Sequence, residues 1–142
     1  MLIKFTKMQS LGRDIMVVNT VTQKVFFSPD LIRRLAHRHF GVGFELMLLV
    51  EPPFDPDFDF HYRLFNCDGE ELEDYYREAA CCCMRFVIEH KLSAKKEIRV
   101  SSAHGSMTLR FNHDESVTVT LDDGSLEMTS SSERIYEGSL VI

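Results

Sequence analysis

Tryptophan is absent from this 142-residue sequence, and only four cysteines occur in it. No apolar run approaches the ~20 residues needed to span a membrane, so we expect no membrane partner. The N-terminal stretch MLIKFTKMQ alternates like a strand and lacks the continuous apolar core of a signal peptide. The cysteines, Cys67 and the adjacent residues 81–83, do not form the dispersed pattern of a secreted disulfide framework. These absences predict a soluble protein of the reducing cytoplasm.

Basic residues are in deficit, because the formal net charge is −6 and no window carries a basic stripe. This balance argues against a nucleic-acid partner. The 44% hydrophobic and 27% charged residues are ordinary values for a globular chain. With no internal repeat or low-complexity linker, residues 1–142 are predicted to form a single domain.

Period-two alternation of apolar and polar residues predicts short strands along most of the chain. Two helices interrupt this pattern. The first is predicted to start at Ser28-Pro29, because serine is a good capping residue and proline suits the first helical turn. It is expected to run to about residue 39 and to end at the following glycines, Gly41 and Gly43.

The second helix is predicted from residue 70 to residue 91. Its acidic first half, Glu70–Asp74, suits the positive end of the helix dipole. Its second half, AACCCMRFVI (79–88), is apolar nearly all round. A helix without a polar face is buried on several sides. We therefore expect an α+β fold in which a curved, mainly antiparallel sheet wraps around this central helix.

The cysteine triplet at 81–83 could be a metal site, a disulfide, a reactive nucleophile or simple packing. Consecutive helical residues point about 100° apart, so three neighbours cannot ligate one metal ion. No C-x2-C spacing typical of zinc sites occurs, and a bond between adjacent helical cysteines would be badly strained. Cysteine behaves as a small hydrophobe when buried. The triplet is therefore predicted to fill the core, with no metal bound.

Four stretches resemble the N-terminal lobe of diaminopimelate epimerase, a cofactor-independent amino-acid racemase. They are FTKMQSLGRDIMVVNTVTQ (5–23), FFSPDLIRRLAHRHFGVGFE (26–45), VEPPFDPDFDFHYRLFNCDG (50–69) and KKEIRVSSAHGSMTL (95–109). The resemblance implies that residues 1–121 form a lobe with a sheet wrapped around a central helix. It also implies that no cofactor is needed, and that the family's active site lies in the cleft between two such lobes.

The C-terminal stretch MTSSSERIYEGSLVI (128–142) resembles the family's own C-terminus, which returns to complete the sheet of the first lobe. Here it follows Leu121 after a short joining turn, residues 122–127. The resemblance thus implies that the second lobe is missing and that the cut ends were rejoined. We interpret the chain as an engineered single lobe, with a natural deletion of the second lobe as the alternative.

The family racemises its substrate with two cysteines, one from each lobe. At the place of the first lobe's nucleophile this chain has Tyr75, and a phenol is a poor replacement for a thiolate. The family's Asn in GLGND is replaced by Arg13, and its Asp-Gln after GVGF by Glu45-Leu46. Asn66 alone is retained among the substrate-binding side chains that can be aligned. The resemblance therefore implies a fold without epimerase activity.

The altered residues are expected to cluster on the face that the second lobe covers in the family. Tyrosine, methionine and arginine are enriched at protein interfaces, and solubilising changes would favour Lys and Glu. We therefore predict a redesigned surface that binds a protein partner or a second copy of the chain. Its predicted members are Arg13, Ile15, Leu46, Met47, Leu72, Tyr75, Tyr76 and Arg77.

An alternative hypothesis is an ester hydrolase in which Cys67 is the nucleophile. Cys67 stands where the family has Ala in NADG, close to the expected cleft. A Cys–His pair needs an imidazole within hydrogen-bond reach, and His104 and His61 are the candidates. No orienting acid and no oxyanion donors are identifiable in the sequence.

Overall fold

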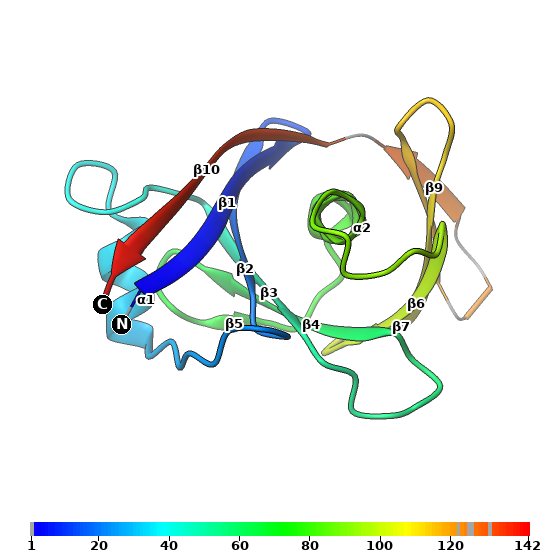
Figure 1. Ribbon diagram of the computed structural model, residues 1–142, viewed down its shortest axis with the longest axis horizontal. Coiled ribbons are helices and arrows are strands. Elements are labelled where there is room, and N and C mark those ends of the chain that lie inside the picture. Colours follow the sequence, from blue (N-terminus) through cyan, green and yellow to red (C-terminus); the bar gives the residue numbers. More distant parts are fainter. Residues whose placement is uncertain (1, 122, 125–126, 131) are drawn as a thin grey trace.

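Helix α2 (Arg77–Glu89) runs through the middle of the molecule, and the strands curve around it (Figure 1). The computed structural model describes residues 2–121, 123–124, 127–130 and 132–142, the segment 127–130 by its backbone alone. Neither helix in these ranges is long and apolar enough to cross a membrane.

The described residues form one mixed, mainly antiparallel sheet of ten strands. Only the β2–β3 and β4–β6 contacts in it are parallel. The short β5 (Glu71–Leu72) pairs with β4 beside this path. In spatial order the other strands are β10 (Glu133–Val141), β1 (Leu2–Ser10), β2 (Arg13–Asn19), β3 (Leu46–Glu51), β4 (Phe60–Asn66), β6 (Glu97–Ser102), β7 (Gly105–Phe111), β8 (Val117–Leu121) and β9 (Glu127–Ser130). The predicted α+β class and the wrapped central helix are confirmed.

Helix α2 is buried along most of its length, as its apolar circumference predicts. The three adjacent cysteines, residues 81–83, are each 0% exposed and pack within the core cluster inside the sheet. The prediction that they fill the core is confirmed. The small side chains of α2 let the surrounding strands approach its backbone closely.

The predicted start of the second helix, at residue 70, is wrong. Residues Glu71 and Leu72 form β5 instead, where Leu72 pairs with Leu64 and the Glu71 carboxylate lies 2.7 Å from Arg63. Tyr76 is the extended residue that precedes α2, so the acidic stretch 70–74 is not helical. Glu78 is the acidic residue in the first turn of α2, near the positive end of its dipole.

Helix α1 (Pro29–Ala36) covers the outer face of β1–β4. Its start is as predicted, since the Ser28 hydroxyl accepts a hydrogen bond from the backbone N–H of Leu31 at 3.1 Å. It ends at Ala36, before the predicted residue 39, because His37 already adopts an extended conformation. The outer face of the sheet is therefore a second core, separate from the one around α2.

This two-sided covering corrects part of the predicted binding surface. Ile15 and Met47 are 0% exposed and Leu46 is 3% exposed. Alternate residues of β2 and β3 face α2 on one side and α1 on the other, so neither strand has a solvent face. Ile15 and Met47 therefore cannot contribute to an exposed surface, and Leu46 contributes only as the floor of a hollow.

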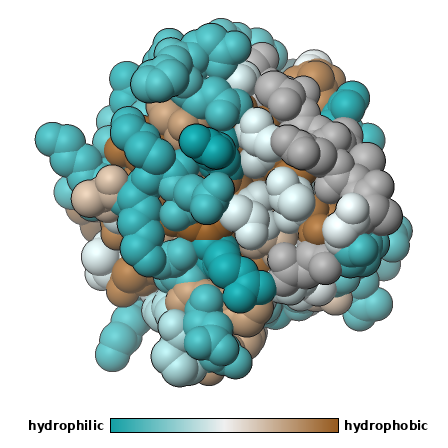
Figure 2. Space-filling model, turned by 90° about the vertical axis from the view of Figure 1, so that its right-hand side faces the viewer, coloured by the Kyte–Doolittle hydropathy of each residue, from teal (hydrophilic) through white to brown (hydrophobic). Residues whose placement is uncertain are grey.

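The C-terminal strand β10 lies antiparallel to β1 and completes that side of the sheet, as expected from its resemblance. Strands β8 and β9 are antiparallel neighbours. Residues 122 and 125–126 of the predicted joining turn 122–127 lie outside the described residues. Figure 2 shows the molecule from the right-hand side of Figure 1, where the coloured part of the surface is mainly hydrophilic with small hydrophobic areas between.

Candidate functional site

A hollow of about 490 Å³ lies at the amino end of α2, where turns from several strands meet. Its walls come from the starts of β2 and β3, the end of β4 and the residues around α1 and α2. The lining residues are Arg13, Ala36, Arg38, Phe44, Glu45, Leu46, Asn66, Cys67, Leu72 and Tyr76.

Arg13 and Tyr76 form one wall of this hollow. The guanidinium of Arg13 lies 5.7 Å from the centre of the Tyr76 ring, a cation–π arrangement. Its Nε is also 3.3 Å from the carboxylate of Glu78 in the first turn of α2. The Arg13 side chain is 41% exposed. Arginine therefore presents part of its charge at the surface while it is held in place by α2.

Arg38 also lines the hollow and is held by Asp14. The guanidinium of Arg38 donates two hydrogen bonds to the Asp14 carboxylate, of which the Nη2–Oδ1 bond is 3.1 Å long. Asp14 also accepts from the backbone N–H of Glu45 at 3.0 Å. The hydrogen bonds from Arg38 lower the pKa of Asp14, and the same contact raises the pKa of Arg38. This pair fixes the loop after α1 against the start of β2.

Asn66, the predicted residual substrate-binding residue, is engaged within its own turn. Its side-chain oxygen accepts hydrogen bonds from the backbone N–H groups of Asp68 and Glu70, each at 3.0 Å. Gly69 closes this turn at φ +84°, and a Cβ there would lie 2.7 Å from the backbone of Pro29. The amide of Asn66 thus shapes the turn that packs against α1.

Tyr75 lies on the inner side of the start of α2, beside His104. Their ring centres are 5.2 Å apart, and His104 Nε2 lies 3.4 Å from the hydroxyl of Tyr62. The Tyr75 hydroxyl is buried and has no hydrogen-bond partner among the described residues. Burial raises the pKa of Tyr75 to about 12 and also raises the pKa of Tyr62. It lowers the pKa of His104, so this cluster is uncharged near neutral pH.

Cys67 is exposed at the rim of the hollow, and the structure does not bring either candidate histidine to it. No hydrogen bond or ring contact between described residues joins Cys67 to His61 or His104. His61 lies at the other end of β4, six residues away, which is roughly 20 Å along an extended strand. Its Nδ1 is 2.8 Å from the Ser101 hydroxyl. A Cys–His pair at Cys67 is therefore not formed.

The remaining thiols are unsuited to nucleophilic chemistry. Burial raises the pKa of Cys83 to about 12 and raises that of Cys82 further. Within the described ranges, no group of three or more His, Cys, Asp or Glu side chains is arranged to hold a metal ion.

Two side chains at this site were missed by sequence reasoning: Arg38, which lines the hollow, and Glu78, which pairs with Arg13. Arg38 lay within the predicted last turn of the first helix, and nothing in the sequence connects it with Asp14, 24 positions away. Glu78 was missed because the helix was predicted to start at residue 70, which places Glu78 well inside it. Its role depends on α2 beginning at Arg77, which the local sequence does not reveal.

Comparison with known proteins supports the same architecture. Among solved structures, methylitaconate-delta-isomerase matches with a TM-score of 0.74 and 9% identity, covering 99% of this chain and 95% of that chain. A phenazine biosynthesis protein of the PhzF family from Enterococcus faecalis matches with a TM-score of 0.62 and 10% identity, covering 84% of this chain and 44% of that one. A hydroxyproline epimerase from Agrobacterium vitis, with bound trans-4-hydroxy-L-proline, gives 0.61 and 14%, covering 84% and 41%.

At these identities the structural likeness shows the fold. The chain spans less than half the length of the phenazine biosynthesis protein and of the hydroxyproline epimerase. At the sequence level, the family model described as diaminopimelate epimerase matches residues 5–129, most of the chain. With the wrapped sheet and the hollow at the amino end of its central helix, the chain belongs to the diaminopimelate epimerase family.

Proposed function

We propose that this chain is a protein-binding lobe of the epimerase fold, without epimerase activity, that associates with a second copy of itself. The contact is made by the residues around the hollow at the amino end of α2. We call this the α2-start surface; it consists of Arg13, Leu72, Tyr75, Tyr76 and Arg77. It keeps the members of the predicted surface that are not fully buried.

The observation that carries the proposal is the residue type at the start of α2. Proton abstraction from an α-carbon requires a base that is deprotonated near neutral pH. Tyr75 has a pKa raised to about 12 and therefore stays protonated. Between described residues, no hydrogen bond joins Cys67 to His61 or His104, and the other thiols are buried. The site is thus equipped for contact and not for racemisation, and no observation favours the cysteine hydrolase.

Self-association is supported by the composition and placement of the α2-start surface. Tyrosine and arginine are the commonest hot-spot residues of protein interfaces. Both types are here partly exposed, and Arg13 and Tyr76 line a hollow that a partner side chain could fill. Because the chain covers only 44% and 41% of two of its relatives, two copies amount to most of one such protein. A stable dimer would bury about 1,600 Å² in total.

Sedimentation equilibrium tests this proposal. We expect a reversible dimer, and Arg13→Glu should weaken it by about tenfold or more. Arg110→Glu is the matched control, since Arg110 is an exposed arginine of β7 and does not line the hollow. A wild-type chain that stays monomeric at high concentration would refute self-association, as would equal weakening by the two variants.

The absence of epimerase activity is tested separately. The protein is incubated in heavy water with LL-diaminopimelate or L-proline, and deuterium at the α-carbon is measured by mass spectrometry. We expect no more deuterium in the amino acid incubated with the protein than in the same amino acid incubated without it. Incorporation that depends on intact protein would show that the α2 end retains a functional base.

An engineered origin, by excision of a second lobe, is part of the proposal. It is supported by the pairing of β8 with β9, because a short turn suffices to join adjacent antiparallel strands. A designed hairpin joint should tolerate another turn residue, so Gly124→Asn, which can keep the φ of +73° and has open space around it, is expected to change the free energy of unfolding by less than about 1 kcal/mol. A large loss of stability would argue for a turn selected within its natural context.

A further inference from the structure

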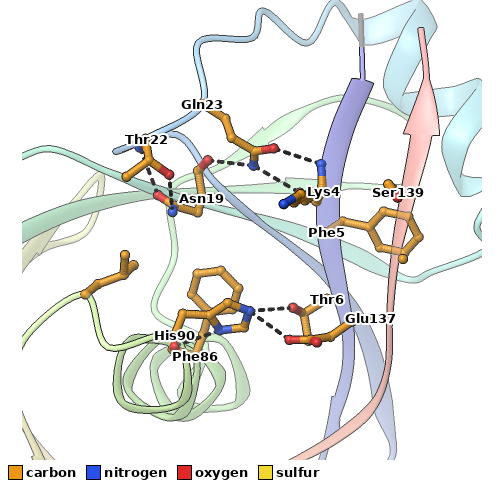
Figure 3. Close-up of a pocket in the computed structure, with 12 residues that line it drawn as sticks. Lys4, Phe5, Thr6, Asn19, Thr22, Gln23, Phe86, His90, Glu137 and Ser139 are labelled. Atoms are coloured by element: carbon orange, nitrogen blue, oxygen red, sulfur yellow. Dashed lines mark hydrogen bonds and ion pairs between the residues drawn. The ribbon is translucent and has the colours of Figure 1, made fainter.

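A second and larger hollow, of about 720 Å³, lies at the carboxyl end of α2. It is open between the paired strands β1 and β10, the end of α2 and the loop that follows β2 (Figure 3). The 13 residues of α2 separate it from the candidate site by about 20 Å. Its volume lies within the roughly 300–1,000 Å³ typical of small-molecule sites.

The floor of this hollow is apolar and rigidly held. The Phe86 and His90 rings stack with centroids 4.1 Å apart, and Leu92 lies beside them. His90 Nε2 is 3.2 Å from the Thr6 hydroxyl and 3.0 Å from the Glu137 carboxylate, which ties α2 to β1 and β10 (Figure 3). A flat aromatic floor of this kind favours a planar or branched apolar body above it.

The side-chain amides at the rim are occupied by structural hydrogen bonds. Gln23 accepts from the backbone N–H of Lys4 at 2.8 Å and donates to the carbonyl oxygens of Lys4 and Asn19, both at 3.0 Å. The Asn19 amide donates to the Thr22 hydroxyl at 2.8 Å. The amides therefore build the wall of the hollow and are not available to a ligand.

The groups left at the rim are hydrogen-bond donors. The Lys4 ammonium has no ion pair among the described residues, and the Ser139 hydroxyl opposite it on β10 has no hydrogen bond there. The Thr22 hydroxyl accepts from Asn19, so its own proton is free to be donated. Among the lining residues the one carboxylate is that of Glu137, which lies 3.0 Å from His90 Nε2 and 3.6 Å from the guanidinium of Arg134, whose positive charge offsets its own. This rim suits an anionic oxygen head group.

We propose that the hollow at the carboxyl end of α2 binds a small monocarboxylate with an aromatic or branched apolar body. The carboxylate lies against Lys4 and Ser139, and the body packs over Leu92 and the His90 ring, which is stacked on the buried Phe86. The site is separate from the α2-start surface, and its occupancy does not depend on self-association.

An NMR titration of the amide resonances with phenylpropionate tests the proposal, with phenylpropanol as the uncharged probe of similar shape. We expect shifts confined to residues around the hollow and tighter binding of the acid than of the alcohol. Lys4→Gln should weaken binding of the acid by about fivefold and leave the alcohol unchanged. Lys91→Gln is the control. It removes the same positive charge, but Lys91, although it follows His90 in the chain, does not line the hollow.

A steric variant keeps the test decisive. Ser139→Trp places a large side chain over the hollow from an exposed position of β10, so the fold should persist while binding of both probes is lost. Equal affinity for acid and alcohol, equal effects of the two lysine variants, or unchanged binding by Ser139→Trp would each overturn the proposal. Failure of both probes to bind at millimolar concentration would overturn it as well.

Discussion

Replacement of Cys82 by serine tests whether the thiols of α2 serve only to pack the core. Cys82 is 0% exposed, and it lies in the core cluster inside the sheet with the other two cysteines of the triplet. A hydroxyl is nearly isosteric with the thiol but has to be desolvated. A buried hydroxyl without a full set of hydrogen bonds costs about 1–3 kcal/mol. A serine in a helix can recover part of this through the carbonyl four residues earlier. We therefore expect Cys82→Ser to lower the free energy of unfolding by about 2 kcal/mol.

Urea unfolding at equilibrium measures this loss. The slope of the unfolding free energy against urea concentration should be the same for the wild type and for Cys82→Ser. Cys67→Ser is the matched control, because Cys67 is exposed and its replacement should change stability by less than about 0.5 kcal/mol. Alkylation of the native protein gives a second readout. Cys67 should be labelled, whereas the triplet should react only after unfolding, since all three thiols are buried and burial raises the pKa of Cys82 and Cys83. Equal stability of both variants, or rapid native labelling of the triplet, would refute the packing role.

Four further changes test the surroundings of the candidate site, each by urea unfolding. Arg38→Gln should cost at most about 1 kcal/mol at neutral pH, because the guanidinium is largely exposed. Since Arg38 lowers the pKa of Asp14, this difference should be full above the ordinary carboxyl value of 3.8 and vanish as the pH falls through the lowered value; a difference that is constant with pH would contradict it. Gly69→Ala should cost about 2–4 kcal/mol, because its positive φ and its contact with the backbone of α1 both oppose a Cβ. Gly12→Ala, with positive φ but open space, should cost less. Tyr75→Phe removes an unpaired buried hydroxyl and should leave stability unchanged or raise it by about 1 kcal/mol; a clear loss would reveal a hidden partner.

The central helix is a feature that the local sequence is sufficient to predict. Residues 79–88 are apolar around the whole circumference, and such a helix can only be stable when it is enclosed. The burial of the cysteine triplet follows from the same pattern. The start of α1 was equally predictable, because the cap depends on Ser28 and on a backbone N–H three residues later.

The start of α2 shows where local reasoning fails. Residues 70–76 are compatible with a helix by their own preferences. They are instead held by Leu64 and Arg63 of β4, through strand pairing and an ion pair. Contacts with a preceding strand thus override the helical preference of this segment.

The pattern of alternation in β2 and β3 left a related question open. It predicts two faces for each strand but does not say what covers them. Helix α1 covers one face and α2 the other, which is why Ile15 and Met47 are buried and not part of a surface.

The sequence was thus sufficient for the fold class, the family resemblance and the burial of the central helix, because these depend on periodicity and on short-range motifs. The tertiary structure decided the composition of the α2-start surface, the separation of Cys67 from His61 and His104, and the hollow at the far end of α2. Each of these depends on where turns and strand ends from distant parts of the chain stand in space. That placement follows from sheet register and from packing on both faces of the sheet, which are long-range properties.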